Sequence, residues 1–207
     1  MLPVGWSLLV PLKSLPRAKT RLRGALAGVG HDRLVLALAL STVRAAQRAA
    51  GVDEVVVVTG DARLRRELAL PGVRLVDDPA DPADPLADPL NVALRGAAAD
   101  LGPDRAVAVL TGDVPALRPA ELAEALMLAD AQRCFVPDRP GTGTVLLAAP
   151  AGQPLDPHFG PGSAAAHARS GAKRLDGAWP SLRCDVDTTA DLAEAVRLGW
   201  LPPAAHG

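Results

Sequence analysis

The sequence predicts an α/β fold in which one mixed, mostly parallel sheet is covered by helices on both faces. Short, largely apolar runs, such as WSLLV at Trp6–Val10 and EVVVVT at Glu54–Thr59, are typical of strands buried on both faces. Helical patterns separate these runs, and this βαβα order predicts parallel strands. Two later runs, Arg133–Pro137 and Thr144–Ala149, are close enough to form a hairpin, so the expected sheet is mixed.

The first helical pattern follows the first strand and runs from His31 to Ala50. Its apolar residues Leu34, Leu38 and Val43 recur on one side, as in a helix that packs one face against a sheet. We expect Gly51 to end this helix, because glycine readily takes the left-handed conformation of a C-terminal cap.

The middle of the chain continues the alternation. Glu54–Thr59 is the clearest strand, because it is β-branched and bounded by turn residues. Asp61 is expected to cap the helix ARLRRELAL that follows. A strand at Val73–Val76, a helix at Asn91–Leu101 and a strand at Ala106–Leu110 complete this part.

The last part of the chain is expected to place three helices and one more strand around the hairpin. The helix at Pro119–Ala131 begins with a proline, which the first turn of a helix tolerates. After the hairpin we expect a short helix from Ser163, a strand at Ser181–Val186 and a final helix at Thr189–Leu198.

The composition predicts one domain that binds neither nucleic acid nor membrane. A chain of 207 residues suits one sizeable core and is short for two, so we expect a single domain over residues 1–207. A net charge of −1 and 2% aromatic residues provide no basic or stacking surface for nucleic acid. The sequence shows no apolar run of membrane-spanning length and no signal-peptide pattern at its start. Two cysteines without metal-ligand spacing fit reduced thiols, and we expect a cytoplasmic protein.

One segment, DDPADPADPLADP at Asp77–Pro89, is strongly biased in composition. Its aspartates and prolines exclude a helix or a central strand, so we expect a mobile, solvated loop. The loop leaves the carboxyl end of a strand, which is the edge at which open α/β sheets bind ligands.

The segment VPLKSLPRAKTRL directly follows the first strand and is rich in cations. These cations are Lys13, Arg17, Lys19 and Arg21. At the carboxyl end of a parallel strand they could bind a polyphosphate, and they could equally be ordinary surface charges.

In VLTGDVPAL, a buried strand ends in Thr-Gly-Asp followed by proline. Asp113 is therefore expected at the edge of the sheet, with Gly112 leaving room beside it for a bulky ligand. A carboxylate there could hold Mg²⁺, which binds one or two carboxylates together with substrate phosphates. Asp113 could instead cap the helix that follows.

The segment CDVDTTADL offers two more carboxylates near its start. Asp185 and Asp187 share one face if the preceding strand extends that far, and one of them could be a second metal ligand opposite Asp113. Alternatively the segment only starts a helix, with one of the two threonines as its cap and Asp191 in its first turn.

Two glycine-containing segments are candidates for binding an anion. In GTGTVLL the glycines let the backbone approach a ligand closely, and Thr144 offers a hydroxyl. In FGPGSAAAH, Ser163 is expected to begin and cap a helix behind Gly160, and the free N–H groups of that helix start can bind an anion. Tight turns would also explain either glycine cluster.

In this order the segments resemble the phosphoenolpyruvate / 2-phospho-L-lactate guanylyltransferases of coenzyme F-420 biosynthesis. The resemblance covers nearly the whole chain and rests on VPLKSLPRAKTRL, LNVAL, TGDVPAL, GTGTVLL, FGPGSAAAH and CDVDTTADL. It implies a single-domain nucleotidyltransferase fold, a GT-A-like and Rossmann-like α/β/α sandwich. It also implies a Mg²⁺-dependent enzyme that transfers GMP from GTP to a phosphorylated three-carbon acid and releases pyrophosphate.

The resemblance further implies roles for individual residues. Those implied for the nucleotide are Pro11, Leu12, Lys13, Lys19, Arg21, Asn91 and Gly112. Those implied for the phosphorylated acid are Thr144, Gly160 and Ser163, and some relatives carry another hydroxyl residue where Val145 stands. The implied Mg²⁺ ligands are Asp113 with Asp185 or Asp187, and the implied catalytic residues are Lys19, Arg21 and Asp113.

The reaction so implied needs no general base, because its nucleophile is a phosphate oxygen that is already anionic. Catalysis then consists of in-line positioning and charge neutralisation. The sequence has no convincing Ser-His-Asp or Cys-His set, and we expect His158 and His167 to be loop and helix-surface residues. One alternative is a molybdenum-cofactor guanylyltransferase, whose Gly-rich opening loop this sequence lacks. Another is a non-catalytic nucleotide-binding regulator.

The expected acceptor is phosphoenolpyruvate, with 2-phospho-L-lactate as the alternative. Abundant Arg, Ala and Pro are typical of a GC-rich genome, and the bacterial members of the family are expected to use phosphoenolpyruvate. The two acids differ by two hydrogens and by planarity at one carbon, which a pocket distinguishes only weakly. The expected partners are therefore GTP and phosphoenolpyruvate, while hand-over of the product to the next transferase and the oligomeric state stay open.

Overall fold

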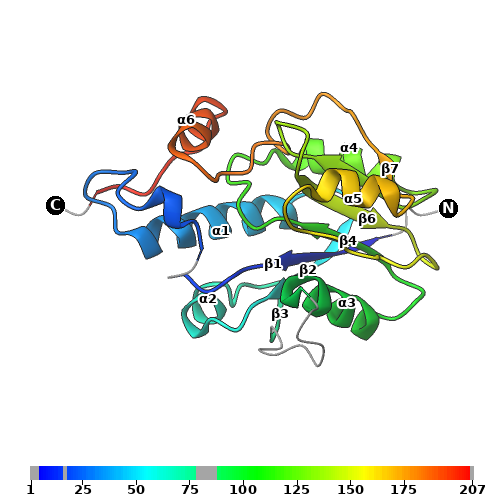
Figure 1. Ribbon diagram of the computed structural model, residues 1–207. Coiled ribbons are helices and arrows are strands. Elements are labelled where there is room, and N and C mark those ends of the chain that lie inside the picture. Colours follow the sequence, from blue (N-terminus) through cyan, green and yellow to red (C-terminus); the bar gives the residue numbers. More distant parts are fainter. Residues whose placement is uncertain (1–4, 16–17, 78–87, 206–207) are drawn as a thin grey trace.

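A computed structural model describes residues 5–15, 18–77 and 88–205 of the protein. Its centre is one seven-stranded sheet with the strand order β3-β2-β1-β4-β6-β5-β7 (Figure 1). The strands are β1 (Trp6–Pro11), β2 (Val52–Val58), β3 (Val73–Val76), β4 (Ala106–Leu110), β5 (Cys134–Pro137), β6 (Thr144–Ala149) and β7 (Lys173–Arg174).

The sheet is mixed and mostly parallel, as predicted. β1 pairs in parallel with β2 and β4, and β2 pairs in parallel with β3. β6 is antiparallel to both β4 and β5, and β7 is parallel to β5. Because β6 runs against β4, the first residues of β6 lie at the same edge of the sheet as the carboxyl ends of β1 and β4.

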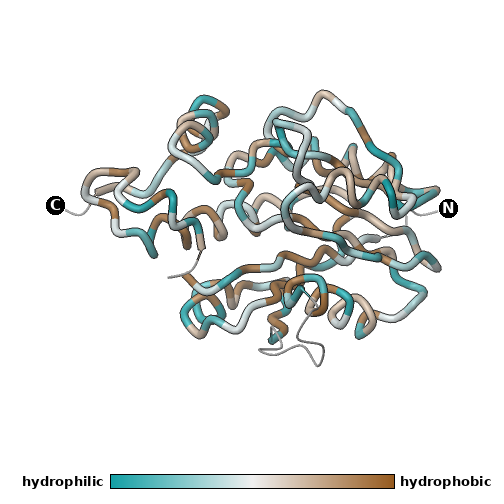
Figure 2. The backbone as a smooth tube through the Cα atoms, viewed as in Figure 1, coloured by the Kyte–Doolittle hydropathy of each residue, from teal (hydrophilic) through white to brown (hydrophobic). Residues whose placement is uncertain are grey.

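Helices cover both faces of the sheet, which confirms the predicted α/β/α sandwich. They are α1 (His31–Gln47), α2 (Ala62–Glu67), α3 (Pro89–Leu101), α4 (Pro119–Leu128), α5 (Ser163–Arg169) and α6 (Thr189–Arg197), with a 3-10 turn η1 (Thr20–Leu22). Apolar residues of α1, α2 and α4 form one core with the strands, and those of α3 and α5 form a second core on the other face. Figure 2 shows the hydrophobic residues concentrated along the central strands.

The last helix, α6, lies away from the sheet, at the end of the molecule opposite β7 (Figure 1). Apolar residues of α6, of η1 and of the first half of α1 form a third cluster there, together with Trp200. This cluster brings the segment before α6 close to the loop after β1.

Most predicted elements are confirmed, with ends that shift by a few residues. Helix α1 ends at Gln47 with Arg48 as its C-cap, so the prediction that Gly51 caps it is wrong. Gly51 lies in the turn before β2, where its φ of 86° requires a left-handed backbone. Asp61 caps α2 as predicted, since its side chain accepts hydrogen bonds from two amides of the first turn.

The predicted strand at Ser181–Val186 is wrong, because this segment forms a turn and an irregular stretch. The amides of Ser181 and Leu182 donate to the carboxylate of Glu121, at 2.9 and 3.0 Å. The amide of Val186 donates to the carbonyl of Asp113 at 2.9 Å. These backbone donors are therefore satisfied by a side chain and a loop, and no neighbouring strand is needed.

The Asp/Pro-rich segment Asp77–Pro89 falls largely outside the described residues, since 78–87 are not described. Its last residue, Pro89, begins α3, and the side chain of Asp88 caps this helix. Among the helices of the described residues, none has the length and apolarity needed to span a membrane.

Candidate active site

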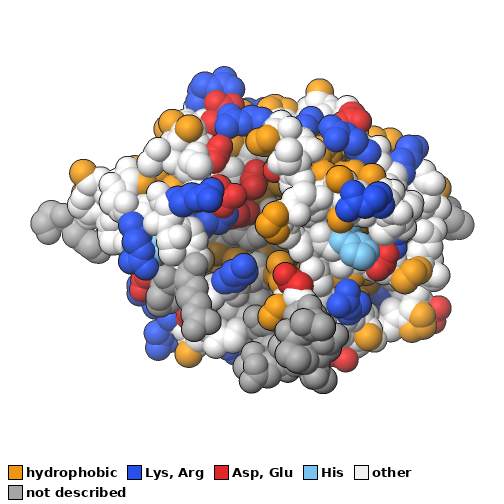
Figure 3. Space-filling model, viewed as in Figure 1, with side chains coloured by type: hydrophobic (Ala, Val, Ile, Leu, Met, Phe, Trp, Pro, Cys, Tyr) orange, Lys and Arg blue, Asp and Glu red, His pale blue; other side chains and the backbone are white. Residues whose placement is uncertain are grey.

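A cavity of about 470 Å³ opens at the carboxyl ends of β1 and β4, the edge at which open α/β sheets hold ligands. Lys13 and Lys19 line it from the loop after β1, and Asp113 lines it from the turn after β4. Leu90 of α3 and Phe159 line the other side. Figure 3 shows acidic and basic side chains gathered around a hollow on this face of the molecule.

Lys19 lies between two carboxylates at this cavity. Its ammonium contacts Asp113 and Asp187, which come from segments far apart in the sequence. Burial alone would lower the pKa of Lys19, but the two carboxylates outweigh burial and raise it above its ordinary value. The backbone of Lys19 is left-handed, with φ at 51°. Such a conformation is strained for a residue with a side chain and persists where the surroundings hold it, as the two ion pairs do here.

The carboxylates of Asp113 and Asp185 have features that fit the binding of a cation. Asp113 contacts Lys19 through Oδ2, while its Oδ1 is buried and has no hydrogen-bond partner among the described residues. Burial, followed by the charge of Asp113, raises the pKa of Asp185 to about 7. The described residues contain no cluster of three side chains ready to hold a metal ion. A metal ion here would thus bind one or two carboxylates and complete its shell from the substrate, as Mg²⁺ commonly does.

Gly112 lets the segments after β1 and β4 approach each other closely. A Cβ at this position would lie 2.1 Å from Cδ2 of Leu12 and 3.2 Å from the carbonyl oxygen of Pro11. The space beside Gly112 is therefore filled by Leu12 rather than left for a bulky ligand. Pro11, Leu12 and Gly112 all line the cavity.

The cations of the loop after β1 have different positions. Lys13 and Lys19 line the cavity, whereas Arg21 is exposed on η1 and is not part of the lining. Arg17 lies outside the described residues. The structure thus brings two of the four predicted phosphate-binding cations to the cavity.

Asp61 connects this loop to α2. Its Oδ1 accepts hydrogen bonds from the amides of Arg63 and Leu64, at 2.9 and 3.0 Å, and its Oδ2 accepts one from Leu15 at 2.9 Å. Burial opposes the ionised form, but these bonds outweigh it and keep the pKa of Asp61 below its ordinary value. The sequence indicated the cap, but it carried no local signal for the bond to Leu15, 46 residues away.

Asn91 is turned toward the protein rather than toward the cavity. Its Nδ2 donates to the carbonyl of Phe159 at 2.9 Å, and its Oδ1 accepts from the amide of Phe159 at 2.8 Å. Both ends of the amide are thereby engaged. Asn91 thus positions Phe159, which does line the cavity, while its own neighbour Leu90 provides the contact surface of α3.

The residues predicted to bind the phosphorylated acid lie around the start of β6 and of α5. Thr144 and Ser163 are buried, and the exposed Gly160 has φ at 138°. The N-cap of α5 is Gly162, so the predicted capping role of Ser163 is wrong. The amide of Ala164 donates to the carbonyl of Thr142 at 3.1 Å, which joins α5 to the glycine segment before β6. None of Thr144, Gly160 and Ser163 is part of the cavity lining, but Phe159 lies directly before Gly160.

Asp138, which the sequence analysis did not single out, shapes the glycine segment. Its carboxylate accepts hydrogen bonds from the amides of Thr142 and Gly143, at 2.9 and 2.8 Å. A Cβ at Gly143 would lie 2.4 Å from this carboxylate, so the glycine is needed for the turn itself. Arg183 donates to the carbonyls of Pro137 and Asp138, at 3.2 and 3.0 Å, and holds the turn from outside.

His167 corrects the expectation of a helix-surface residue, because its side chain is completely buried. Its Nδ1 lies 2.9 Å from Oγ1 of Thr144, and its Nε2 accepts a hydrogen bond of 2.9 Å from the amide of His158. Phe135 and Phe159 pack against the ring, with centroids 5.9 and 5.1 Å away. His158 is an exposed loop residue, as expected.

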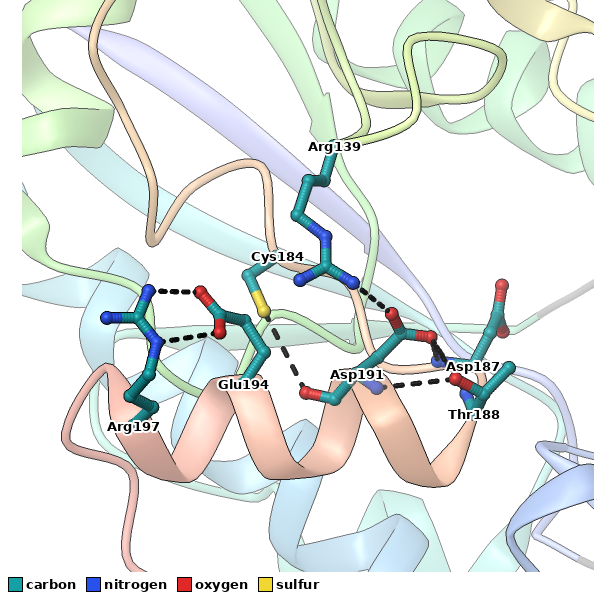
Figure 4. Close-up of polar contacts among 7 residues, drawn as sticks. All are labelled: Arg139, Cys184, Asp187, Thr188, Asp191, Glu194 and Arg197. Carbon is teal, nitrogen blue, oxygen red and sulfur yellow. Dashed lines mark hydrogen bonds and ion pairs between the residues drawn. The ribbon is translucent and has the colours of Figure 1, made fainter.

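The turn before α6 holds Asp187 in place (Figure 4). Thr188 and Asp191 form a capping box, in which each side chain bonds the backbone of the other residue. Arg139 forms an ion pair with the second oxygen of Asp191, at 2.8 Å. The carboxylate of Asp191 bonds the backbone of this turn, and the side chain of Asp187 points away from it (Figure 4). The carboxylate of Asp187 contacts Lys19 instead. The predicted cap by one of the two threonines is confirmed.

Comparison with known proteins identifies the domain family to which the chain is similar. Residues 25–188 match the model of the MobA-like NTP transferase domain. The CMP:2-keto-3-deoxy-manno-octonic acid synthetase complexed with CTP has a similar structure, with a TM-score of 0.58 and 16% identity over 93% of this chain and 98% of that chain. This likeness shows a shared fold.

Curated relatives are far more similar in sequence. The phosphoenolpyruvate guanylyltransferase of Salinispora arenicola is 53% identical over 97% of this chain and 92% of its own length. The phosphoenolpyruvate guanylyltransferase of Mycobacterium ulcerans is 44% identical over 96% of this chain and 91% of its own length. The chain therefore belongs to the phosphoenolpyruvate guanylyltransferase family, which is built on the MobA-like NTP transferase domain.

Proposed function

We propose that this protein transfers GMP from GTP to phosphoenolpyruvate, giving enolpyruvyl-diphospho-guanosine and pyrophosphate. Relatives that are 44–53% identical are named for this activity. The structural observation that carries the proposal is the cluster of Lys19, Asp113 and Asp187 at the cavity. Carboxylates that can hold a cation beside lysines are the groups that a triphosphate requires.

In this reaction a phosphate oxygen of phosphoenolpyruvate forms a bond to the α-phosphorus of GTP. The bond from that phosphorus to the oxygen bridging to the β-phosphate breaks, and its electron pair leaves with pyrophosphate. Since the attacking oxygen is already anionic at neutral pH, no side chain has to accept a proton. The residues of the protein contribute alignment and charge balance.

The residues around the cavity suit these tasks. Asp113, with Asp185 or Asp187, would hold Mg²⁺, which when bound supplies charge neutralisation to the phosphates. Lys13 and Lys19 would bind phosphate oxygens from the loop after β1. Arg21 lies away from the lining, so the proposal for the triphosphate rests on the two lysines.

On the acid side, the hydroxyls of Thr144 and Ser163 would donate hydrogen bonds to the phosphorylated acid. Gly160 would leave its backbone accessible, because it is exposed and has no side chain. Thr144 lies beside the turn after β4, since the amide of Thr111 donates to the carbonyl of the adjacent Val145 at 3.0 Å. The acid would thus reach the triphosphate from the β6 side of the cavity.

Pyrophosphate release tests the proposal directly. We expect release with GTP, Mg²⁺ and phosphoenolpyruvate, and slower release with 2-phospho-L-lactate. No release with either acid would contradict the enzymatic function and favour a nucleotide-binding regulator. Faster release with 2-phospho-L-lactate would identify that acid as the acceptor.

The variant Asp113→Asn tests the proposed metal ligand. It should reduce turnover by about 100-fold or more, because it removes the negative charge of a carboxylate proposed to hold Mg²⁺ beside the phosphates. Its matched control is Asp104→Asn, on an exposed loop outside the cavity lining, which should leave turnover unchanged. A folded Asp113→Asn protein with normal turnover would remove Asp113 from the proposed metal site.

We further propose that the reaction belongs to coenzyme F-420 biosynthesis and takes place in the cytoplasm. The support is the family resemblance and the need for GTP and phosphoenolpyruvate in one compartment. The product is a labile diphosphate ester, which favours direct hand-over to the next transferase. Trapping of the product by that transferase, in competition with hydrolysis, would test the hand-over.

A further inference from the structure

The buried His167 connects three segments around the residues assigned to the acid. It lies on α5, contacts Thr144 at the start of β6 and contacts His158 in the loop before α5. Both contacts are 2.9 Å long, and each involves a different nitrogen of the ring. The rings of Phe135 and Phe159 cover the histidine, so the two nitrogens have no access to water.

The contact at Nε2 determines which ring nitrogen carries the hydrogen. A backbone amide can only donate, so Nε2 has to be the unprotonated nitrogen that accepts from His158. Burial, followed by the charges of His158 and Arg133, lowers the pKa of His167 to about 4, so the ring is neutral at pH 7. A neutral ring with an unprotonated Nε2 carries its hydrogen on Nδ1. His167 is therefore the donor in its contact with Thr144, and the backbone of Ser163 provides a further acceptor for the ring.

The direction of this hydrogen bond decides what the hydroxyl of Thr144 can do. Because Nδ1 of His167 carries a hydrogen, the hydroxyl hydrogen of Thr144 cannot point toward the ring. The described residues provide no second hydrogen-bond partner for this hydroxyl. Thr144 lies at the edge of the sheet, next to the turn that ends in Asp113. Its hydroxyl hydrogen is thus free to be donated to an acceptor at that edge.

We propose that His167 orients the hydroxyl of Thr144 as a hydrogen-bond donor to the acid substrate. The inference rests on the proposed function, because it treats Thr144 as a contact of the phosphorylated acid. His167 touches no substrate in this arrangement and acts through Thr144. It is a positioning residue, and through His158 it also holds the loop that leads to Gly160.

Two substitutions of His167 separate its two contacts. His167→Gln keeps an acceptor near the position of Nε2 and loses the donor to Thr144, whereas His167→Asn keeps a donor near Nδ1 and loses the acceptor for His158. We expect the glutamine variant to raise KM for phosphoenolpyruvate roughly 3- to 10-fold, the effect of losing one hydrogen bond between neutral groups. Its KM for GTP should stay within about twofold of the wild-type value, and the asparagine variant should bind phosphoenolpyruvate more tightly than the glutamine variant.

The same substitution in a protein that lacks the Thr144 hydroxyl tests whether His167 acts through Thr144. In Thr144→Val, which has already lost the hydroxyl, His167→Gln should change KM for phosphoenolpyruvate by less than about twofold. An equal increase with and without the hydroxyl would overturn the inference, and so would an equal rise in KM for GTP and for phosphoenolpyruvate.

Nitrogen NMR of the ligand-free wild-type protein tests the inference without an activity measurement. It also needs no variant, so it does not depend on whether a variant folds. At pH 7 we expect Nδ1 of His167 to carry the hydrogen and Nε2 to be unprotonated. A hydrogen on Nε2, or a doubly protonated ring, would overturn the inference. A wild-type protein that releases no pyrophosphate would contradict the proposed function instead, and the ring spectrum would still decide the state of His167.

Discussion

At the scale of single residues, buried His167 makes the stability of the protein depend on pH. Its pKa is about 4 in the folded protein, against an ordinary value of 6.5. Between these values the unfolded chain binds a proton that the folded protein does not bind, so the free energy of unfolding falls as the pH drops from about 6.5 to 4. His158 and Arg133 disfavour a charge on this ring and Asp156 favours it.

Unfolding in urea at pH 7 and at pH 4.5 measures this effect. We expect wild type to lose about 2 to 3 kcal/mol more than His167→Gln over this range. The pKa of Asp156 is also shifted, but downward from 3.8, so its contribution is lost at a lower pH. Equal losses in the two proteins would contradict the assignment of this pH dependence to His167.

Sequence reasoning identified some residues of the site and missed others for a physical reason. Asp113, Asp187 and Lys19 each follow or precede a recognisable element, so their meeting at one edge of the sheet could be expected. His167 stands in an alanine-rich helix, and such a helix gives no apolar stripe that would show which face is buried. Its burial comes from Phe135 and Phe159, which the fold brings from other elements.

At the scale of elements, Asp61 combines the capping of α2 with the anchoring of the loop after β1. Asp61→Ala removes both functions, and we expect it to lower the free energy of unfolding by about 1 to 2 kcal/mol and to raise KM for GTP. Asp61→Asn can keep the cap through its remaining oxygen. Its amide nitrogen then takes the place of Oδ2, and because this nitrogen cannot accept a hydrogen bond, the bond from the amide of Leu15 is lost. The asparagine variant should therefore keep most of the stability and still raise KM for GTP.

Chemical unfolding and GTP kinetics of the two Asp61 variants check this prediction. The matched control is Arg66→Ala, on the exposed face of α2, which should leave the KM for GTP unchanged. A normal KM for GTP in Asp61→Asn would show that the bond to Leu15 does not position the loop.

The elements themselves were predictable where local sequence decides them. β4 is a continuous apolar run, and β2 and β6 contain such runs at Val55–Val58 and Val145–Ala149, so their composition favours buried strands. The segment Ser181–Val186 alternates polar and apolar residues, as a strand can, but it is not a strand, because Glu121 and the carbonyl of Asp113 take its backbone donors. Such partners lie far away in the sequence, so the pattern of the segment itself could not reveal them.

At the scale of the whole molecule, the cavity joins segments from several distant elements. The loop after β1, the turn after β4, α3, Phe159 and the turn before α6 all contribute to its lining. A nucleotide that contacts these segments binds the folded chain only, and therefore stabilises it.

Thermal unfolding should show this stabilisation. With GTP and Mg²⁺ at about 100 times their dissociation constant, the gain is roughly 2.7 kcal/mol, or roughly 5 to 10 °C for a chain of this size. Asp113→Asn should lose most of this shift, and Asp104→Asn should keep it. A melting temperature that does not respond to GTP would contradict nucleotide binding in this cavity.

The α/β/α sandwich could be predicted from the alternation of strands and helices, and the predicted hairpin of β5 and β6 is present. The order of the strands could not be predicted from the sequence, because the pairing between β4 and β6 depends on contacts that no local pattern encodes. This reversed strand determines the site, since it places Thr144 at the same edge as Asp113.

The position of Lys19 between Asp113 and Asp187 means that the protein carries its own counter-ion. The two carboxylates can come together during folding without a divalent ion from solution, because the ammonium offsets their mutual repulsion. If Asp113 and Asp187 hold Mg²⁺ as proposed, binding of that ion would exchange one cation for another at these carboxylates. The ammonium of Lys19, which lines the cavity, would then be available to the phosphates of the proposed GTP substrate.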